Sequence, residues 1–122
     1  MDQKLLDLYT KLQPKFREVM EPIRIGDMAA WWDNIVYFVT TDFQAKCVAG
    51  GNGYIIFPRT IDDSSEEARK RSLWGMLKGH KMLEEDKTGR IYLSVTEQDS
   101  IYADNPTEAI LRALCAQWEV EV

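Results

Sequence analysis

Residues 104–118, Asp-Asn-Pro-Thr-Glu-Ala-Ile-Leu-Arg-Ala-Leu-Cys-Ala-Gln-Trp, form the clearest helical pattern in the chain. Asn105 suits the N-cap, Pro106 the first helical position, and Glu108 the carboxylate of a capping box. Beyond the cap the stretch is almost wholly apolar, and we predict that Glu108 and Arg112, four residues apart, pair on its solvent side. A helix this apolar must pack against other elements, so we expect it to cover one face of a sheet.

Strand patterns fill much of the chain before this helix. Residues 90–95 alternate apolar and polar side chains, and residues 101–103 form a short apolar run. Four earlier runs also have the composition of strands: residues 28–32, 35–40, 45–49 and 54–57. Asp33-Asn34 and Asn52-Gly53 are the predicted hairpin turns between them. These segments predict a mainly antiparallel sheet of four to six strands.

Two further segments have helical spacing. Residues 3–20 repeat leucines three and four positions apart, and Pro14 predicts a kink or a second helix that begins near Gln13. Residues 61–77 predict a middle helix with a break near Ser72. The chain therefore reads as a single α+β domain over residues 1–122, with an N-terminal, a middle and a C-terminal helix packed on the sheet.

Composition and charge exclude several classes of function. The 122 residues are 45% hydrophobic and 29% charged, which is typical of a globular protein. The net charge of −5 disfavours binding to nucleic acid or to an anionic membrane by the whole surface, although it leaves a local basic patch open. The start lacks the apolar block of a signal peptide, and no run is long enough to span a bilayer. We therefore expect a cytoplasmic protein with no membrane partner.

The residues offer little catalytic chemistry. Cys47 and Cys115 lie far apart and match no metal-ligand spacing, so reduced thiols are expected. The single histidine, His80, follows a glycine at a predicted helix end, where it can interact with exposed carbonyls. A small enzyme that pairs Cys47 or Cys115 with His80 is the least favoured function. The acids of residues 62–67 fit a helix N-terminus. We predict no catalytic residue, no metal and no cofactor.

Residues 69–81 have the character of a binding site. Trp74 and His80 lie among five basic residues, with no acid: Arg69, Lys70, Arg71, Lys78 and Lys81. Such a pattern is typical of a nucleic-acid contact. Pairing of the basic side chains with Glu66 and Glu67, with Trp74 in the core, explains the same pattern more simply.

Adjacent tryptophans make a second candidate. Neighbouring residues of a strand point to opposite faces, so one of Trp31 and Trp32 should face solvent, a helix or a partner. An exposed one would mark an interaction surface. The candidate binding surface therefore comprises Trp31, Trp32, Arg69, Lys70, Arg71, Trp74, Lys78, His80 and Lys81.

Three short motifs carry a resemblance: Ile25-Gly26-Asp27, residues 73–77 (Leu-Trp-Gly-Met-Leu) and residues 105–114 (Asn-Pro-Thr-Glu-Ala-Ile-Leu-Arg-Ala-Leu). Over about half its length the chain resembles small proteins of unknown function encoded by bacteriophages and prophages. Met28 stands where such proteins often have tryptophan. The resemblance implies a bacterial cytoplasmic setting and an accessory role, and it brings no catalytic residue.

The predicted function is thus that of a non-enzymatic accessory protein that binds a macromolecule. An unidentified protein is the expected partner. Weak nucleic-acid binding through residues 69–81 is the alternative, and the net charge disfavours it. The sequence leaves the oligomeric state open.

Overall fold

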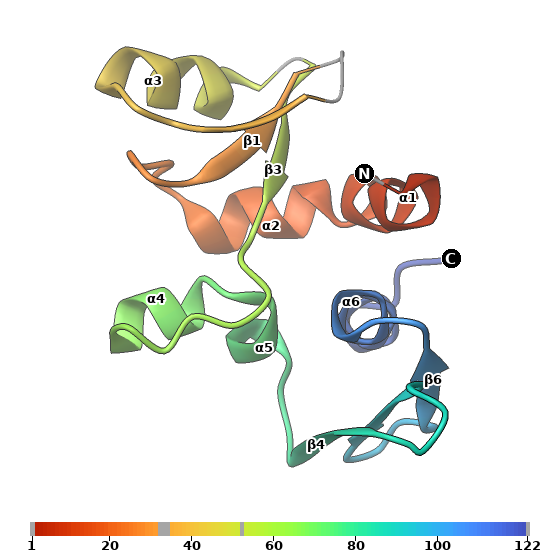
Figure 1. Cartoon of the computed structure of the whole chain (residues 1–122). Coiled ribbons are helices and arrows are strands. Elements are labelled where there is room, and N and C mark those ends of the chain that lie inside the picture. Colours follow the sequence, from red (N-terminus) through yellow and green to blue (C-terminus); the bar gives the residue numbers. More distant parts are fainter. Residues whose placement is uncertain (1, 32–34, 52, 122) are drawn as a thin grey trace. The chain divides into compact units, whose positions relative to one another are not determined.

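The computed structural model of the chain describes residues 2–31, 35–51 and 53–121 (Figure 1). It confirms the α+β class, because these residues form six helices and two three-stranded antiparallel sheets. The chain divides into two compact units, Met1–Arg59 (unit 1) and Thr60–Val122 (unit 2), and each unit contains one sheet. The strands are expected to form one sheet, and they form two separate sheets instead. A single domain over residues 1–122 stays a prediction.

Unit 1 begins with two short helices, α1 (Gln3–Lys11) and α2 (Gln13–Met20). The predicted interruption near Pro14 is confirmed, since Leu12 ends α1 and α2 restarts at the next residue. Pro14 lacks an N–H and cannot continue the hydrogen-bond ladder of α1. Leu12 and Phe16 on either side of the break are fully buried.

The sheet of unit 1 has the strand order β2-β1-β3, with β1 (Met28–Ala30) in the centre. β2 (Val36–Phe38) and β3 (Ile55–Phe57) both run antiparallel to it, so that Met28 lies opposite Phe38 on one side and Phe57 on the other. α1 and α2 pack on β3, where Tyr9 meets Phe57 edge-on at 4.9 Å. Burial in this contact raises the pKa of Tyr9 to about 12.

Helix α3 (Asp42–Gly50) replaces one of the predicted strands. The strand expected over residues 45–49 is wrong, because Thr41 caps a helix by accepting a hydrogen bond from the Gln44 N–H. Gly51 ends the helix with a φ of 97°. The expected hairpin before residues 54–57 is therefore also wrong. Asn52 and the predicted turn at residues 33–34 lie outside the described residues.

The sheet of unit 2 has the order β4-β5-β6, formed by β4 (Lys81–Glu85), β5 (Ile91–Val95) and β6 (Ile101–Ala103). The strands at β5 and β6 are confirmed, whereas β4 has no predicted counterpart because three of its five residues are charged. As expected, helix α6 (Pro106–Gln117) packs on the sheet, against β5 and β6.

The cap of α6 is confirmed in detail. The Asn105 side chain accepts from the Glu108 N–H at 2.8 Å, and Glu108 reaches back to the Asp104 N–H at 3.2 Å. The predicted position of Glu108 on the solvent side is wrong, because this residue is only 3% exposed. Arg112 donates instead to the Tyr102 carbonyl at 2.9 Å.

The middle helix is broken where the sequence predicts, into α4 (Glu66–Lys70) and α5 (Leu73–Met76). Ser72 lies at the break: its hydroxyl donates to the Arg69 carbonyl and accepts from the Gly75 N–H. A Cβ atom at position 75 would lie 1.8 Å from the Arg69 carbonyl oxygen. Only glycine fits at this position.

Candidate interaction surface

Exposed apolar side chains are concentrated in unit 1. Among the described residues, seven of the ten large apolar side chains that are exposed belong to this unit: Val19, Ile25, Trp31, Ile35, Val36, Phe38 and Phe43. Phe43, on the first turn of α3, is 76% exposed. Unit 1 also has seven acidic and seven basic residues, so unit 2 carries the whole net charge of −5. Unit 1 therefore exposes more large apolar side chains than unit 2 and carries no net charge.

Trp31 is the exposed tryptophan of the predicted binding surface. It follows β1, is 44% exposed, and stacks on Tyr54 with ring centroids 6.0 Å apart and an interplanar angle of 22°. Trp32 lies outside the described residues. Trp74, in unit 2, is partly buried.

The two edges of the unit 1 sheet differ. On the β3 edge the side-chain amide of Gln13 binds both backbone groups of Ile56: it accepts from the N–H at 2.8 Å and donates to the carbonyl at 2.9 Å. Gln13 thus acts as a substitute for a neighbouring strand and closes this edge.

The β2 edge is open along Val36 and Phe38. Both backbone groups of Val39 bond toward β1, to Asp27 and Gly26. Because antiparallel strands alternate their bonding direction, the N–H and C=O groups of Val36 and Phe38 point away from the sheet. Within the described part of the chain these two residues form no hydrogen bond outside the β1–β2 ladder. Their side chains are 41% and 53% exposed.

The open edge ends at Thr40. The backbone N–H and the hydroxyl of Thr40 both donate to the side-chain oxygen of Gln44, at 2.7 and 2.8 Å. Phe38 also has a basic neighbour, since the Arg59 guanidinium carbon lies 5.8 Å from the centre of its ring. The edge therefore presents a short apolar segment with one end closed by Gln44 and one ring covered in part by a cation.

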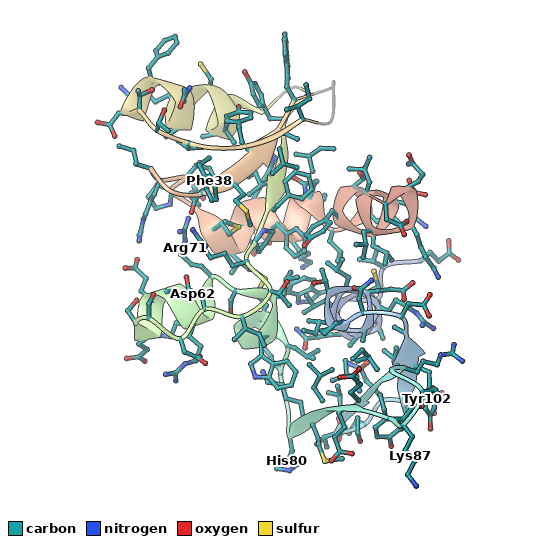
Figure 2. The ribbon with its side chains drawn as sticks, viewed as in Figure 1. Phe38, Asp62, Arg71, His80, Lys87 and Tyr102 are labelled. Carbon is teal, nitrogen blue, oxygen red and sulfur yellow. The ribbon has the colours of Figure 1, made fainter. Side chains whose placement is uncertain are left out.

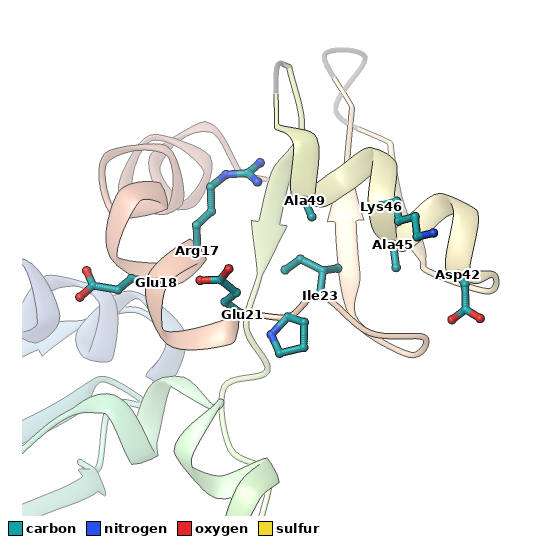
Figure 3. A pocket seen from close by; sticks show the side chains of 9 residues that line it. Arg17, Glu18, Glu21, Ile23, Asp42, Ala45, Lys46 and Ala49 are labelled. Atoms are coloured by element: carbon teal, nitrogen blue, oxygen red, sulfur yellow. The ribbon is translucent and has the colours of Figure 1, made fainter.

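A groove of ≈ 700 Å³ lies between α2 and α3 (Figure 3). It is lined by Arg17, Glu18, Glu21, Pro22, Ile23, Asp42, Ala45, Lys46 and Ala49. Its volume is within the range of small-molecule sites. The lining sets the apolar side chains of Ile23, Ala45 and Ala49 beside charged groups of both signs. Such a groove can accept a molecule that has an apolar part and a polar end, with the polar end paired with Glu21 or Lys46.

Arg17 holds one wall of this groove in place. Its guanidinium donates to the carbonyls of Val48 and Tyr54, both at 2.8 Å, and to that of Gly51 at 3.4 Å. These bonds satisfy carbonyls at the end of α3, and partial burial lowers the pKa of Arg17. Arg17 therefore ties α2 to the end of α3 and to the start of β3.

The basic stretch of residues 69–81 does not form one surface. Lys81 donates to the carbonyls of Trp74 and Leu77, and its amine lies 4.9 Å from the centre of a Trp74 ring. Burial lowers the pKa of Lys81. Lys78 and His80 are exposed, and Figure 2 shows His80 far from Arg71 within unit 2.

Arg69 and Lys70 each pair with an acid. Arg69 lies 3.4 Å from the Asp63 carboxylate, and Lys70 lies 3.6 Å from Glu66, four residues earlier. All four side chains are exposed, so each pair stabilises unit 2 by about 0.5 kcal/mol or less. Nucleic-acid binding by residues 69–81 stays a prediction, and these contacts give it little support.

The cysteines and the histidine differ in burial and in the unit to which they belong. Cys115 is fully buried in α6, whereas His80 is exposed. Cys47 lies on α3 of unit 1 and His80 in unit 2, so an enzyme that uses this pair also stays a prediction. Across residues 2–31, 35–51 and 53–121, no cluster of three or more His, Cys, Asp or Glu side chains is arranged to hold a metal ion.

The sequence points to some of the exposed residues of this surface and not to others. The pair Trp31-Trp32 draws attention to Trp31, which is exposed, but nothing in the sequence identifies Phe43, because residues 45–49 resemble a strand and not the helix that exposes it. In the part of the chain that is described, none of the helices has the length and hydropathy that crossing a membrane requires. Comparison of the chain with protein-family models, with curated proteins and with solved structures finds no match.

Proposed function

We propose that this chain is a non-enzymatic accessory protein that acts by binding another protein through unit 1. The observation that carries the proposal is the concentration of exposed large apolar side chains in unit 1, with Phe43 the most exposed. Exposed apolar side chains mark interaction sites in soluble proteins where they form a contiguous patch.

The physical basis is the cost of leaving aromatic rings in water. Phe43, Phe38 and Trp31 together expose much of three large rings, and burial of such rings against a partner supplies most of the binding energy at protein interfaces. Unit 1 has no net charge, so it does not repel a partner of either sign. The acidic unit 2 keeps the net charge away from zero, which favours solubility.

The setting of this function is the bacterial cytoplasm, in a phage or prophage context. This part of the proposal rests on the resemblance of residues 25–27, 73–77 and 105–114 to small phage-encoded proteins. It brings no activity with it, and binding of a protein encoded by the phage or by its host is the role that suits the exposed surface.

The test compares two serine variants as bait in a bacterial host. Phe43→Ser removes the most exposed ring of unit 1, and Met82→Ser removes a side chain of unit 2 that is 45% exposed. Neither side chain belongs to the core, so both variants should fold. We expect the wild type and Met82→Ser to capture the same partner, and Phe43→Ser to lose at least tenfold in affinity for it.

Affinities for the captured partner are then measured by calorimetry with purified proteins. Equal affinities of the wild type and Phe43→Ser, together with a loss in Met82→Ser, would place the binding site in unit 2 and refute the proposal. The absence of any partner specific to the wild type would refute it as well.

A further inference from the structure

On the open β2 edge of unit 1, the outward backbone N–H and C=O groups of Val36 and Phe38 have no hydrogen-bond partner among the described residues. Backbone N–H and C=O groups bond strongly, and proteins normally cover or protect a row of such groups. Here Gln13 covers the β3 edge and Gln44 covers Thr40, whereas Val36 and Phe38 remain open between apolar side chains. Glutamine side chains thus bind Ile56 on one edge and the Thr40 N–H on the other, but not the segment between Val36 and Phe38.

The sequence of the segment itself contains no residue that protects against pairing with another strand. Residues 35–41 read Ile-Val-Tyr-Phe-Val-Thr-Thr, with no charged residue, no proline and no glycine. Every residue is β-branched or aromatic, which favours a strand. Natural edges are normally protected by lysine, proline or a bulge. An uncharged edge of this composition is suited to pairing with an identical copy.

We propose that β2 pairs antiparallel with β2 of a second copy of this chain, about a twofold axis at Tyr37. The outward-facing residues Val36 and Phe38 flank Tyr37 symmetrically. In this register Val36 lies opposite Phe38 of the second copy, and each such pair exchanges two hydrogen bonds. The two pairs form four bonds and satisfy all the outward groups of both segments. The two sheets then join into one of six strands.

Side chains and charges agree with this register. Val36 and Phe38 point to the same face of the sheet, so a branched side chain packs on an aromatic ring at both pairs. Tyr37 meets Tyr37 of the second copy on the other face, as a non-hydrogen-bonded pair. Pairing cannot continue through the Thr40 N–H, because Gln44 occupies it. Unit 1, which carries the edge, has no net charge, and the −5 of each chain lies in unit 2.

Sedimentation equilibrium over a concentration series tests the pairing. We expect the mass of the wild type to rise from 14.1 kDa toward twice that value. Val36→Pro removes only an N–H that faces outward, so the β1–β2 ladder should survive while two of the four intermolecular bonds disappear. We expect this variant to dimerise about tenfold more weakly or worse. Phe38→Lys should also be monomeric, and the control Met82→Lys should match the wild type.

Cross-linking tests the register. Cα atoms of a non-hydrogen-bonded antiparallel pair lie about 4.5 Å apart, within the span of a disulfide. In a Cys47→Ser background, we expect Tyr37→Cys to form an intermolecular disulfide with oxidised glutathione, and the additional change Val36→Pro to lower its yield at the same protein concentration. A wild type that stays at 14.1 kDa at all concentrations, or a Val36→Pro variant that dimerises like the wild type, would overturn the inference. Partner capture by Phe43→Ser is a separate measurement, so the proposed function and this inference can fail independently.

Discussion

Gln13 binds the backbone of Ile56 through both atoms of its side-chain amide, at 2.8 and 2.9 Å. The two residues are 43 positions apart, and their contact joins the start of α2 to the outer edge of β3. A primary amide offers an N–H donor and a C=O acceptor side by side, the same pair that a strand backbone offers, and its second N–H is left to donate to the Tyr9 carbonyl at 2.9 Å. Gln13 therefore completes the ladder of β3 without an additional strand.

Replacement of Gln13 by alanine should destabilise unit 1. The change leaves the N–H and C=O of the buried residue Ile56 without partners, and we expect the free energy of unfolding to fall by about 2 kcal/mol. The control is Gln3→Ala on α1, where the exposed amide bonds only to Asp7. That change should alter stability by no more than about 0.5 kcal/mol. Urea denaturation measures both, and equal midpoints would contradict this role of Gln13.

The sequence predicts those parts of the fold that are determined by residues close together in the chain. The cap at Asn105 and the break at Ser72 are set by residues within one helical turn, and both are predicted correctly. Helix α3 is not predicted because residues 45–49, Ala-Lys-Cys-Val-Ala, fit a short strand as well as a helix, and the Thr41 cap that decides between them lies outside this run. Burial of Glu108 is missed because it depends on the packing of α6 on its sheet.

The candidate surface is less predictable than the fold. Strand alternation predicts that one of Trp31 and Trp32 is exposed without saying which, and closure of one sheet edge by Gln13 and not of the other depends on contacts between residues far apart in sequence. At residues 69–81 the opposite happens, because a sequence pattern typical of binding is used partly for contacts inside the protein. Its spacing resembles a binding site, yet Lys81 is used to satisfy the carbonyls of Trp74 and Leu77.

Gly75→Ala should be one of the most destabilising single methyl additions in unit 2. The new Cβ would lie 1.8 Å from the Arg69 carbonyl oxygen, so the backbone at the α4–α5 break must move. We expect a loss of about 3 kcal/mol in the free energy of unfolding. Gly50→Ala is the matched control, because a Cβ there meets nothing within 4 Å. It should be neutral or slightly stabilising. Thermal denaturation compares the two, and similar melting temperatures would show that the α4–α5 break adapts without cost.

Asp86 should make the β4–β5 hairpin sensitive to acid. One oxygen of its carboxylate accepts from the Thr88 hydroxyl at 2.7 Å and from the N–H groups of Thr88 and Arg90, both at 2.9 Å. The hydrogen bond from the Thr88 side chain, followed by that from the Arg90 backbone, lowers the pKa of Asp86 below its ordinary value of 3.8. Because the folded state prefers the ionised form, its stabilising effect is complete well above pH 3.8 and is lost as the pH falls through the lowered pKa.

The measurement is the melting temperature of the wild type and of Asp86→Ala between pH 7 and pH 2. We expect the wild type to melt higher at neutral pH, and the difference to shrink only below the ordinary pKa of 3.8, as protonation removes the charge that Thr88 and Arg90 stabilise. Asp99→Ala is the control, since the side chain of Asp99 forms no hydrogen bond within the described residues. A gap between the wild type and Asp86→Ala that stays constant down to pH 2 would mean that the hairpin depends on the shape of the Asp86 side chain and not on its charge.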